Sequence, residues 1–123
     1  MARILVVDDQ DDIREVVSEM LALDGHLVRA VPTGRMGLEA CSAEEFDVVV
    51  TDIIMPGSHG LDMILELRSR YPDLRIVAMS GGGQAGPEGF LQAAERLGAT
   101  VTIAKPFTCE QLAQAVQTAL TKN

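Results

Sequence analysis

The sequence predicts an α/β fold in which a doubly wound, parallel, five-stranded sheet is covered by helices on both faces. Short apolar runs alternate five times with segments whose apolar residues recur at helical spacing. The strand-like runs are apolar on both faces, as buried parallel strands are. The chain has 123 residues, of which 47% are hydrophobic and 23% charged, so it can bury a core and stay soluble. We therefore expect one domain over residues 1–123.

Five strands follow from the short apolar, β-branched runs. They are expected at residues 3–7, 27–31, 46–51, 75–80 and 101–104. The second run is the weakest because Arg29 interrupts it. A five-stranded doubly wound sheet commonly takes the order 2-1-3-4-5 with right-handed crossovers. The second strand is then an edge strand, away from the point where the strand order reverses.

Helical spacing and end signals predict five helices. They are expected from residue 13 to before Gly25, from 36 to before Phe46, from 61 to before Tyr71, from 88 to 97 and from 109 to 120. Thr33 and Thr108 are the expected N-caps of the second and fifth helices, and Gly25 is the expected stop of the first. Residues 55–60 and 81–86 are rich in turn formers and predict loops.

Charge and cysteine usage exclude several classes of protein. Ten basic residues against 18 acidic ones give a net charge of −8 and a pI near 4.6. This balance argues against nucleic-acid binding and suits a module that binds cations or basic surfaces. Cys41 and Cys109 form no disulfide framework or zinc site, and we expect two buried free thiols in a reducing compartment. No signal peptide or membrane-length apolar run is evident, so we expect a cytoplasmic protein without membrane contact.

Polar residues stand at the carboxyl ends of four of the five expected strands. Asp8 and Asp9 follow the first, Asp52 the third and Lys105 the fifth, while Ser80 ends the fourth. In open α/β sheets the site lies beyond these ends, where the strand order reverses. That point lies between the first and third strands, so we expect the three carboxylates to converge there, with the serine and the lysine at the same edge.

These residue types predict phosphoryl transfer to a carboxylate. Clustered carboxylates repel one another unless a cation is present, and hard oxygen ligands suit Mg²⁺. Lys105 and Ser80 would bind phosphoryl oxygens, and an aspartate can itself be the nucleophile. Taken singly, each residue has a simpler interpretation as a helix-capping acid, a turn residue or a surface lysine. Asp11 and Asp12 do belong to that simpler class, because a helix start favours negative charge.

Four segments in one order and spacing carry a family resemblance: residues 4–9, residues 52–57 with Gly60, Ser80, and residues 105–107. Together they resemble a response regulator receiver domain, the phosphorylated part of two-component signalling. The resemblance covers essentially the whole chain. It implies a flavodoxin-like, three-layer (βα)5 fold, in agreement with the order 2-1-3-4-5.

The resemblance implies that Asp52 accepts a phosphoryl group from a sensor histidine kinase or a histidine phosphotransfer protein. Asp8, Asp9, Asp52 and the backbone carbonyl of Ile54 would hold Mg²⁺, for which Mn²⁺ could substitute. Asp9 would be a direct ligand, and Asp8 would act largely through water. Lys105 would pair with Asp52 before phosphorylation and with the phosphate afterwards.

The resemblance also implies a switch, with Ser80 and Thr102 as the switch positions. Ser80 would hydrogen-bond the phosphoryl group and pull the loop at 81–86 with it. The face made by the fourth helix, fifth strand and fifth helix would then change and control an output domain or partner protein, and it could form a dimer on phosphorylation. Thr102 stands where the family often has an aromatic residue, so the glycine-rich loop is expected to carry more of the change. The Lys105–Pro106 bond is expected to be cis.

Two other functional classes use a similar sheet. A phosphatase with an aspartyl nucleophile typically has a second aspartate two positions later, where this chain has Ile54. A flavin or nucleotide binder is disfavoured because the turn at residues 8–12 is acidic and lacks glycine. We therefore expect a signalling domain rather than an enzyme, one that assists its own phosphorylation and slow dephosphorylation. Both a stand-alone regulator and the N-terminal domain of a larger protein fit the sequence.

Overall fold

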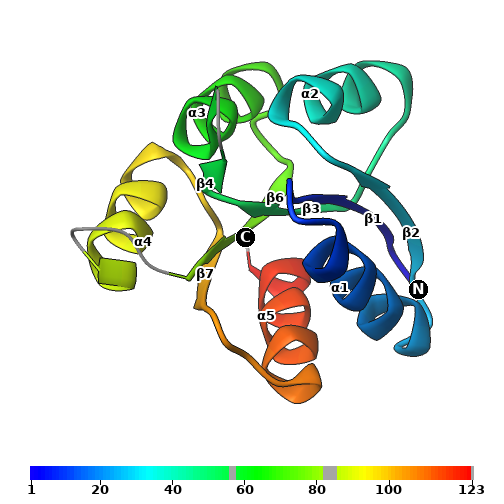
Figure 1. Ribbon diagram of the computed structural model, residues 1–123. Helices are drawn as coiled ribbons and strands as arrows, with labels where there is room; N and C mark the ends of the chain where they lie inside the picture. Colours follow the sequence, from blue (N-terminus) through cyan, green and yellow to red (C-terminus); the bar gives the residue numbers. More distant parts are fainter. Residues whose placement is uncertain (56–57, 82–85, 123) are drawn as a thin grey trace.

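A parallel five-stranded sheet lies at the centre of the molecule (Figure 1). The computed structural model describes the backbone of residues 1–55, 58–81 and 86–122 and the side chains of residues 1–53, 61–81 and 92–122. The strands are β1 (Arg3–Val7), β2 (Leu27–Val31), β3 (Val48–Asp52), β6 (Arg75–Ser80) and β7 (Val101–Ala104). Their order is β2-β1-β3-β6-β7, which confirms the predicted order 2-1-3-4-5 with β6 and β7 as the fourth and fifth strands.

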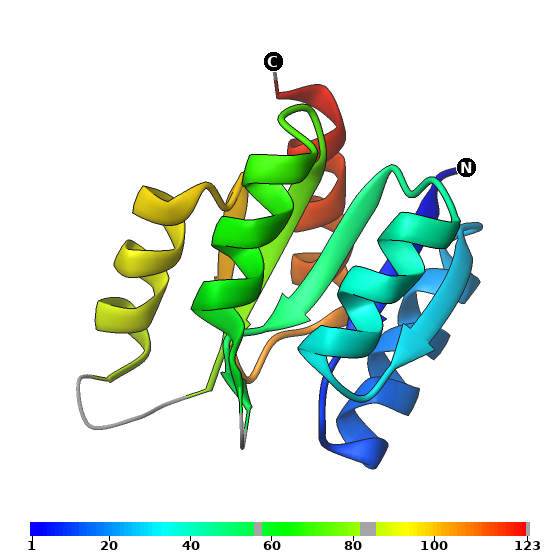
Figure 2. The same cartoon turned by 90° about the horizontal axis from the view of Figure 1, so that it is seen from above.

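Helices cover both faces of this sheet. The described helices are α1 (Asp11–Leu23), α2 (Gly34–Ala43), α3 (Gly60–Arg70), α4 (Gly86–Leu97) and α5 (Cys109–Thr121). Helices α1 and α5 lie on one face, and α2, α3 and α4 lie on the other (Figures 1 and 2). In Figure 2 the loops that follow the carboxyl ends of the strands lie at the bottom, and both termini lie at the top. Within the described residues, no helix has the length and apolar character that a membrane span needs.

The two-residue period of the strands divides the core into two layers. Ile4 and Val6 of β1 face the layer that α1 and α5 cover, whereas Leu5 and Val7 face the layer of α2, α3 and α4. All four side chains are fully buried. Each contributes about 1.5–3 kcal/mol by its burial. Because both faces are covered, the central strands β1, β3 and β6 are mostly apolar, and the polar side chains that can bind ligands stand at the strand ends.

The structure confirms the predicted N-caps of α2 and α5 and the predicted stop of α1. Thr33 Oγ1 accepts a hydrogen bond from the backbone N–H of Met36 at 3.1 Å. Thr108 forms a reciprocal capping box with Gln111 at the start of α5. Gly25 follows α1 with a φ of +91°, a left-handed conformation that favours glycine.

The structure differs from the prediction in its connecting segments and cysteines. Instead of a loop, β4 (Ile54–Met55) and β5 (Ser58–His59) pair as a short antiparallel ribbon after β3. Residues 82–85 of the expected glycine-rich loop lie outside the described residues. The prediction of two buried thiols was wrong: Cys109 is exposed in the first turn of α5, and Cys41 is only partly buried.

Candidate functional site

Three aspartates meet where the strand order reverses. Asp8 and Asp9 follow β1, and Asp52 is the last residue of β3, the strand beside β1. One carboxylate oxygen from each lies within 4.8 Å of the others. Asp8 is fully buried, Asp52 is buried and Asp9 is partly buried. Three acids held this closely repel one another, so the cluster is unfavourable unless positive charge is nearby.

Lys105 brings one positive charge to this cluster. Its Nζ lies 3.1 Å from Asp8 Oδ2 and 3.4 Å from Asp52 Oδ2, and its side chain is only 13% exposed. The ammonium therefore lies between the two buried carboxylates and slightly nearer Asp8. The expected cis bond between Lys105 and Pro106 is present at the end of β7. One lysine does not balance three carboxylates, so the cluster keeps a net negative charge.

The connector between β1 and α1 carries two of the three acids. Asp8 Oδ1 accepts a hydrogen bond from the backbone N–H of Gln10 at 2.9 Å. The backbone N–H of Asp8 donates to the carbonyl of Val31 at 3.3 Å, which ties the connector to β2. Arg14 Nη1 donates to the carbonyl of Asp8 at 2.9 Å. The connector is thus held by contacts from three directions.

Ser80 places a buried, unsatisfied hydroxyl at the same edge. It is the last residue of β6, and its Oγ has no hydrogen-bond partner among the described residues. Its carbonyl accepts a hydrogen bond from the backbone N–H of Lys105 at 2.8 Å. An unsatisfied buried hydroxyl costs about 1–3 kcal/mol, and such groups call for a functional explanation. A ligand oxygen at this edge would supply the missing partner.

The donor set fits a small, hard divalent cation. Asp8, Asp9 and Asp52 offer carboxylate oxygens only, which Mg²⁺ prefers, and their net negative charge would attract it. Fewer protein ligands than the six of an octahedral ion would leave positions for water or phosphate oxygens. Ile54 lies two residues beyond Asp52 in β4, so its backbone directly follows the cluster.

Thr102, a predicted switch residue, is not part of this cluster. It lies on β7, three residues before Lys105, and is partly buried. Its Oγ1 is 3.4 Å from Glu95 Oε1 of α4. Glu95 and Arg14 were not predicted from the sequence, because their contacts depend on how separate elements pack. The only local signal was the spacing of Arg14 from Asp11, one turn earlier on α1.

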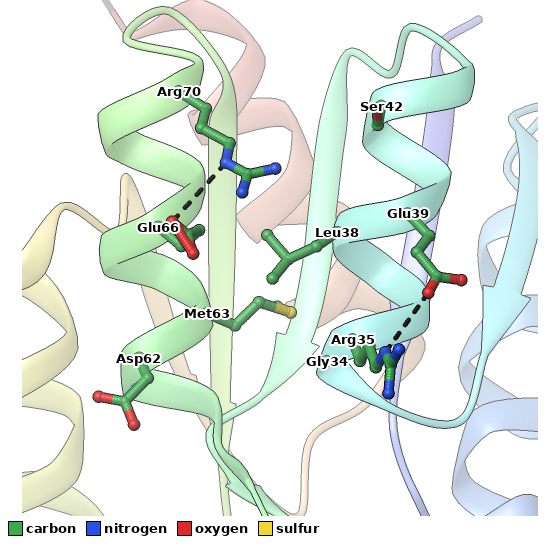
Figure 3. A pocket seen from close by; sticks show the side chains of 9 residues that line it. All are labelled: Gly34, Arg35, Leu38, Glu39, Ser42, Asp62, Met63, Glu66 and Arg70. Carbon is green, nitrogen blue, oxygen red and sulfur yellow. Dashed lines mark ion pairs between the residues drawn. The ribbon is translucent and has the colours of Figure 1, made fainter.

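A cavity of about 560 Å³ between α2 and α3 shares no residue with the aspartate cluster (Figure 3). Leu38 and Met63 point into it from the two helices. Arg35 pairs with Glu39 at 3.5 Å along one wall, and Arg70 pairs with Glu66 at 3.6 Å along the other. These exposed pairs within one helix are ordinary surface features. We therefore take the aspartate cluster at the strand ends, and not this cavity, as the candidate functional site.

Comparison with protein families places this geometry in a known group. A sequence model of the response regulator receiver domain matches residues 4–117. The DNA-binding transcriptional regulator NtrC of Azospirillum brasilense is 38% identical over 99% of this chain. The chain spans only about a quarter of that relative's length, 25%. Sporulation initiation phosphotransferase F of Bacillus subtilis is 28% identical over 94% of this chain and 90% of its own.

Solved structures agree with this result. The receiver domain of NtrX from Brucella abortus superposes with a TM-score of 0.90 at 34% identity, over 98% of this chain and 99% of that one. Chemotaxis protein CheY4 of Vibrio cholerae has a TM-score of 0.87 at 33% identity, with 98% and 99% of the two chains covered. Both neighbours match this chain over nearly their full lengths.

Proposed function

Since the chain belongs to the response regulator receiver domain family of two-component signalling, we propose that it accepts a phosphoryl group on Asp52. The observation that carries this proposal is the position of Asp52 within 4.8 Å of Asp8 and Asp9 and 3.4 Å from the ammonium of Lys105. A carboxylate so placed has a cation to receive the incoming phosphoryl oxygens and neighbours that would bind a metal. Asp8, the other buried acid, also accepts a hydrogen bond from the backbone N–H of Gln10.

The chemistry follows from these positions. An oxygen of Asp52 attacks phosphorus, and the bond from phosphorus to a histidine nitrogen of the donor breaks. That nitrogen keeps the electron pair, so no oxidant or further reactant is needed. Bound Mg²⁺, or Mn²⁺ in its place, would supply charge neutralisation at the phosphoryl oxygens. Asp8, Asp9, Asp52 and the carbonyl of Ile54 would hold it, Asp9 directly and Asp8 largely through water.

Lys105 and Ser80 would act on the product. The ammonium would exchange part of its contact with Asp52 for a phosphoryl oxygen, and the Ser80 hydroxyl would donate to another. This contact would satisfy an Oγ that otherwise lacks a partner within the described residues. Movement of Ser80 would pull the segment after β6, and Thr102, bonded to Glu95 of α4, would transmit the change between β7 and α4.

The partners are proposed from the surface beside the site. A mostly apolar groove of about 280 Å³ is lined by α1 residues, among them Val16 and Met20, and by Phe107 after β7. Lys105 also lines it, so the groove adjoins the aspartate cluster. We propose that a sensor histidine kinase or phosphotransfer protein delivers its phosphohistidine from this side, in the cytoplasm.

An output domain or partner protein, or a second copy of the chain, would then bind the α4–β7–α5 face. This domain would not itself bind nucleic acid and would be a phosphoacceptor rather than an enzyme in its own right.

Intact-protein mass spectrometry with acetyl phosphate tests the proposal. The wild-type protein should gain one phosphoryl group in the presence of Mg²⁺ and none with a chelator, and Asp52→Asn should gain none. If the phosphoryl group is lost too fast to detect, a titration with beryllofluoride, which mimics the phosphoryl group without being hydrolysed, replaces it. Changes in NMR chemical shifts then report binding. Absence of both an adduct and a beryllofluoride response would refute phosphoacceptor function.

A further inference from the structure

Arg14 of α1 donates a hydrogen bond to the connector that carries Asp8 and Asp9. Arg14 Nη1 donates to the backbone carbonyl of Asp8 at 2.9 Å, and Nη2 of the same guanidinium donates to Asp11 Oδ1 at 2.6 Å. The Arg14 side chain is only 21% exposed, whereas that of Asp11 is 89% exposed. The guanidinium therefore joins the end of β1 to the first turn of α1 across a three-residue connector.

This contact matters because the start of α1 has no conventional cap. Gln10 occupies the N-cap position without a side-chain capping bond. The partly buried Asp9 has no hydrogen bond or ion pair from its side chain to any other described residue, so its direction depends on its backbone. The carbonyl of Asp8 and the nitrogen of Asp9 belong to one planar peptide unit. Fixing that carbonyl fixes the point from which the Asp9 side chain projects.

We propose that Arg14 is a positioning residue for the magnesium site, which acts by orienting the Asp8–Asp9 peptide and so the Asp9 carboxylate. This inference rests on the proposed function, because Asp9 is there the direct metal ligand. The planar fork of a guanidinium suits a contact with two acceptors at once. Groups that orient metal ligands typically change metal affinity by 10–100-fold when removed, about tenfold at the lower end.

A positioning role and a simple charge effect predict opposite results. Arg14 adds a positive charge near a cation site, so charge alone would make its removal strengthen Mg²⁺ binding. Loss of positioning would weaken it. A lysine at this position keeps the charge but loses the two-pronged fork. Positioning therefore predicts weaker binding for Arg14→Lys, whereas a charge effect predicts no change.

Isothermal titration calorimetry of the unphosphorylated protein with Mg²⁺ alone, repeated with Mn²⁺, measures the affinity directly. Wild type, Arg14→Lys, Arg14→Met and Arg35→Met are compared well below their melting temperatures. Arg35 is a matched control, because its side chain is 89% exposed on α2 and pairs with Glu39 one turn later in the same helix. We expect the Kd to rise by about tenfold in both Arg14 variants and to stay unchanged in Arg35→Met.

The outcomes separate the inference from the proposed function. Unchanged or tighter Mg²⁺ binding in the two Arg14 variants, with a wild type that binds normally, would overturn the positioning role alone. A lower melting temperature with an unchanged Kd would likewise assign Arg14 to stability only. A wild type that binds no Mg²⁺ would instead overturn the metal site on which both depend. In metal-free protein, the amide resonances of Asp9 and Gln10 should shift and exchange faster in Arg14→Met than in Arg35→Met.

Discussion

Neutralising Asp9 is expected to stabilise the protein in the absence of metal. Asp9 lies within 4.8 Å of the other two carboxylates, measured between ligand oxygens, and its side chain has no compensating partner in the described part of the chain. Asp8 and Asp52 both contact the ammonium of Lys105. The formal charges of these three groups sum to −1, so they leave Asp9 beside one excess negative charge. The variant Asp9→Asn keeps the shape of the side chain and removes its charge.

The size of the effect follows from Coulomb's law. At 4.8 Å two like unit charges repel by about 0.9 kcal/mol in water and by about 3.5 kcal/mol at an effective dielectric constant of about 20. Since Asp9 is only partly buried, we expect the metal-free free energy of unfolding to rise by about 1–2 kcal/mol. For a domain of this size, that corresponds to a melting temperature higher by about 3–10 °C.

Thermal unfolding with a chelator and with Mg²⁺ tests this expectation. The wild type should gain stability when Mg²⁺ is added, and Asp9→Asn should gain much less, because it has lost a ligand. Asp12→Asn is the control. Asp12 is exposed in the first turn of α1 and accepts a hydrogen bond from Ile13, so its neutralisation should lower stability slightly. A metal-free Asp9→Asn protein that is less stable than the wild type would refute the idea that repulsion between the three carboxylates destabilises the metal-free protein.

Three further results are expected. Lys105→Met removes the ammonium that contacts two buried carboxylates, so the metal-free free energy of unfolding should fall by about 3–5 kcal/mol. Mg²⁺ should then restore more stability to the variant than it adds to the wild type. A loss below about 1 kcal/mol in urea unfolding would count against the pairing with Asp8. Burial raises the pKa of the Cys41 thiol to about 11, so at pH 8 iodoacetamide should label the exposed Cys109 first, and peptide mapping that finds the reverse order would contradict this assignment. Arg68 donates to carbonyls at the ends of α3 and α4, so Arg68→Met should cost about 1–3 kcal/mol in urea unfolding, and a neutral result would show those carbonyls to be solvated instead.

The sequence predicted those features that depend on local pattern and strand topology. Apolar runs predicted the strands, the usual topology of doubly wound sheets predicted their order, and threonines before helical segments predicted the caps at Thr33 and Thr108. Asp8 and Asp52 follow neighbouring parallel strands, so the sequence predicts that both lie at the carboxyl edge of the sheet.

The features that the sequence did not predict depend on packing between elements that are distant in the chain. The sequence could not show that the Lys105 ammonium lies nearer Asp8 than Asp52, because this depends on the path of the chain after β7. The buried position of His26, whose Nδ1 accepts from the backbone N–H of Ala2, likewise arises from a contact between separate segments. Cys109 was expected to be buried on its residue type, but the first turn after the Thr108 cap faces solvent.

The central claim is that Asp52 is the phosphoacceptor, and chemical mapping of the phosphorylated residue tests it most directly. The protein is treated with acetyl phosphate and Mg²⁺ and then with borohydride, which reduces an acyl phosphate to the alcohol. Peptide mass spectrometry should find homoserine at position 52 and unmodified aspartate at positions 8 and 9. Reduction at Asp8 or Asp9, or a borohydride-resistant phosphate on Ser80, would contradict the account.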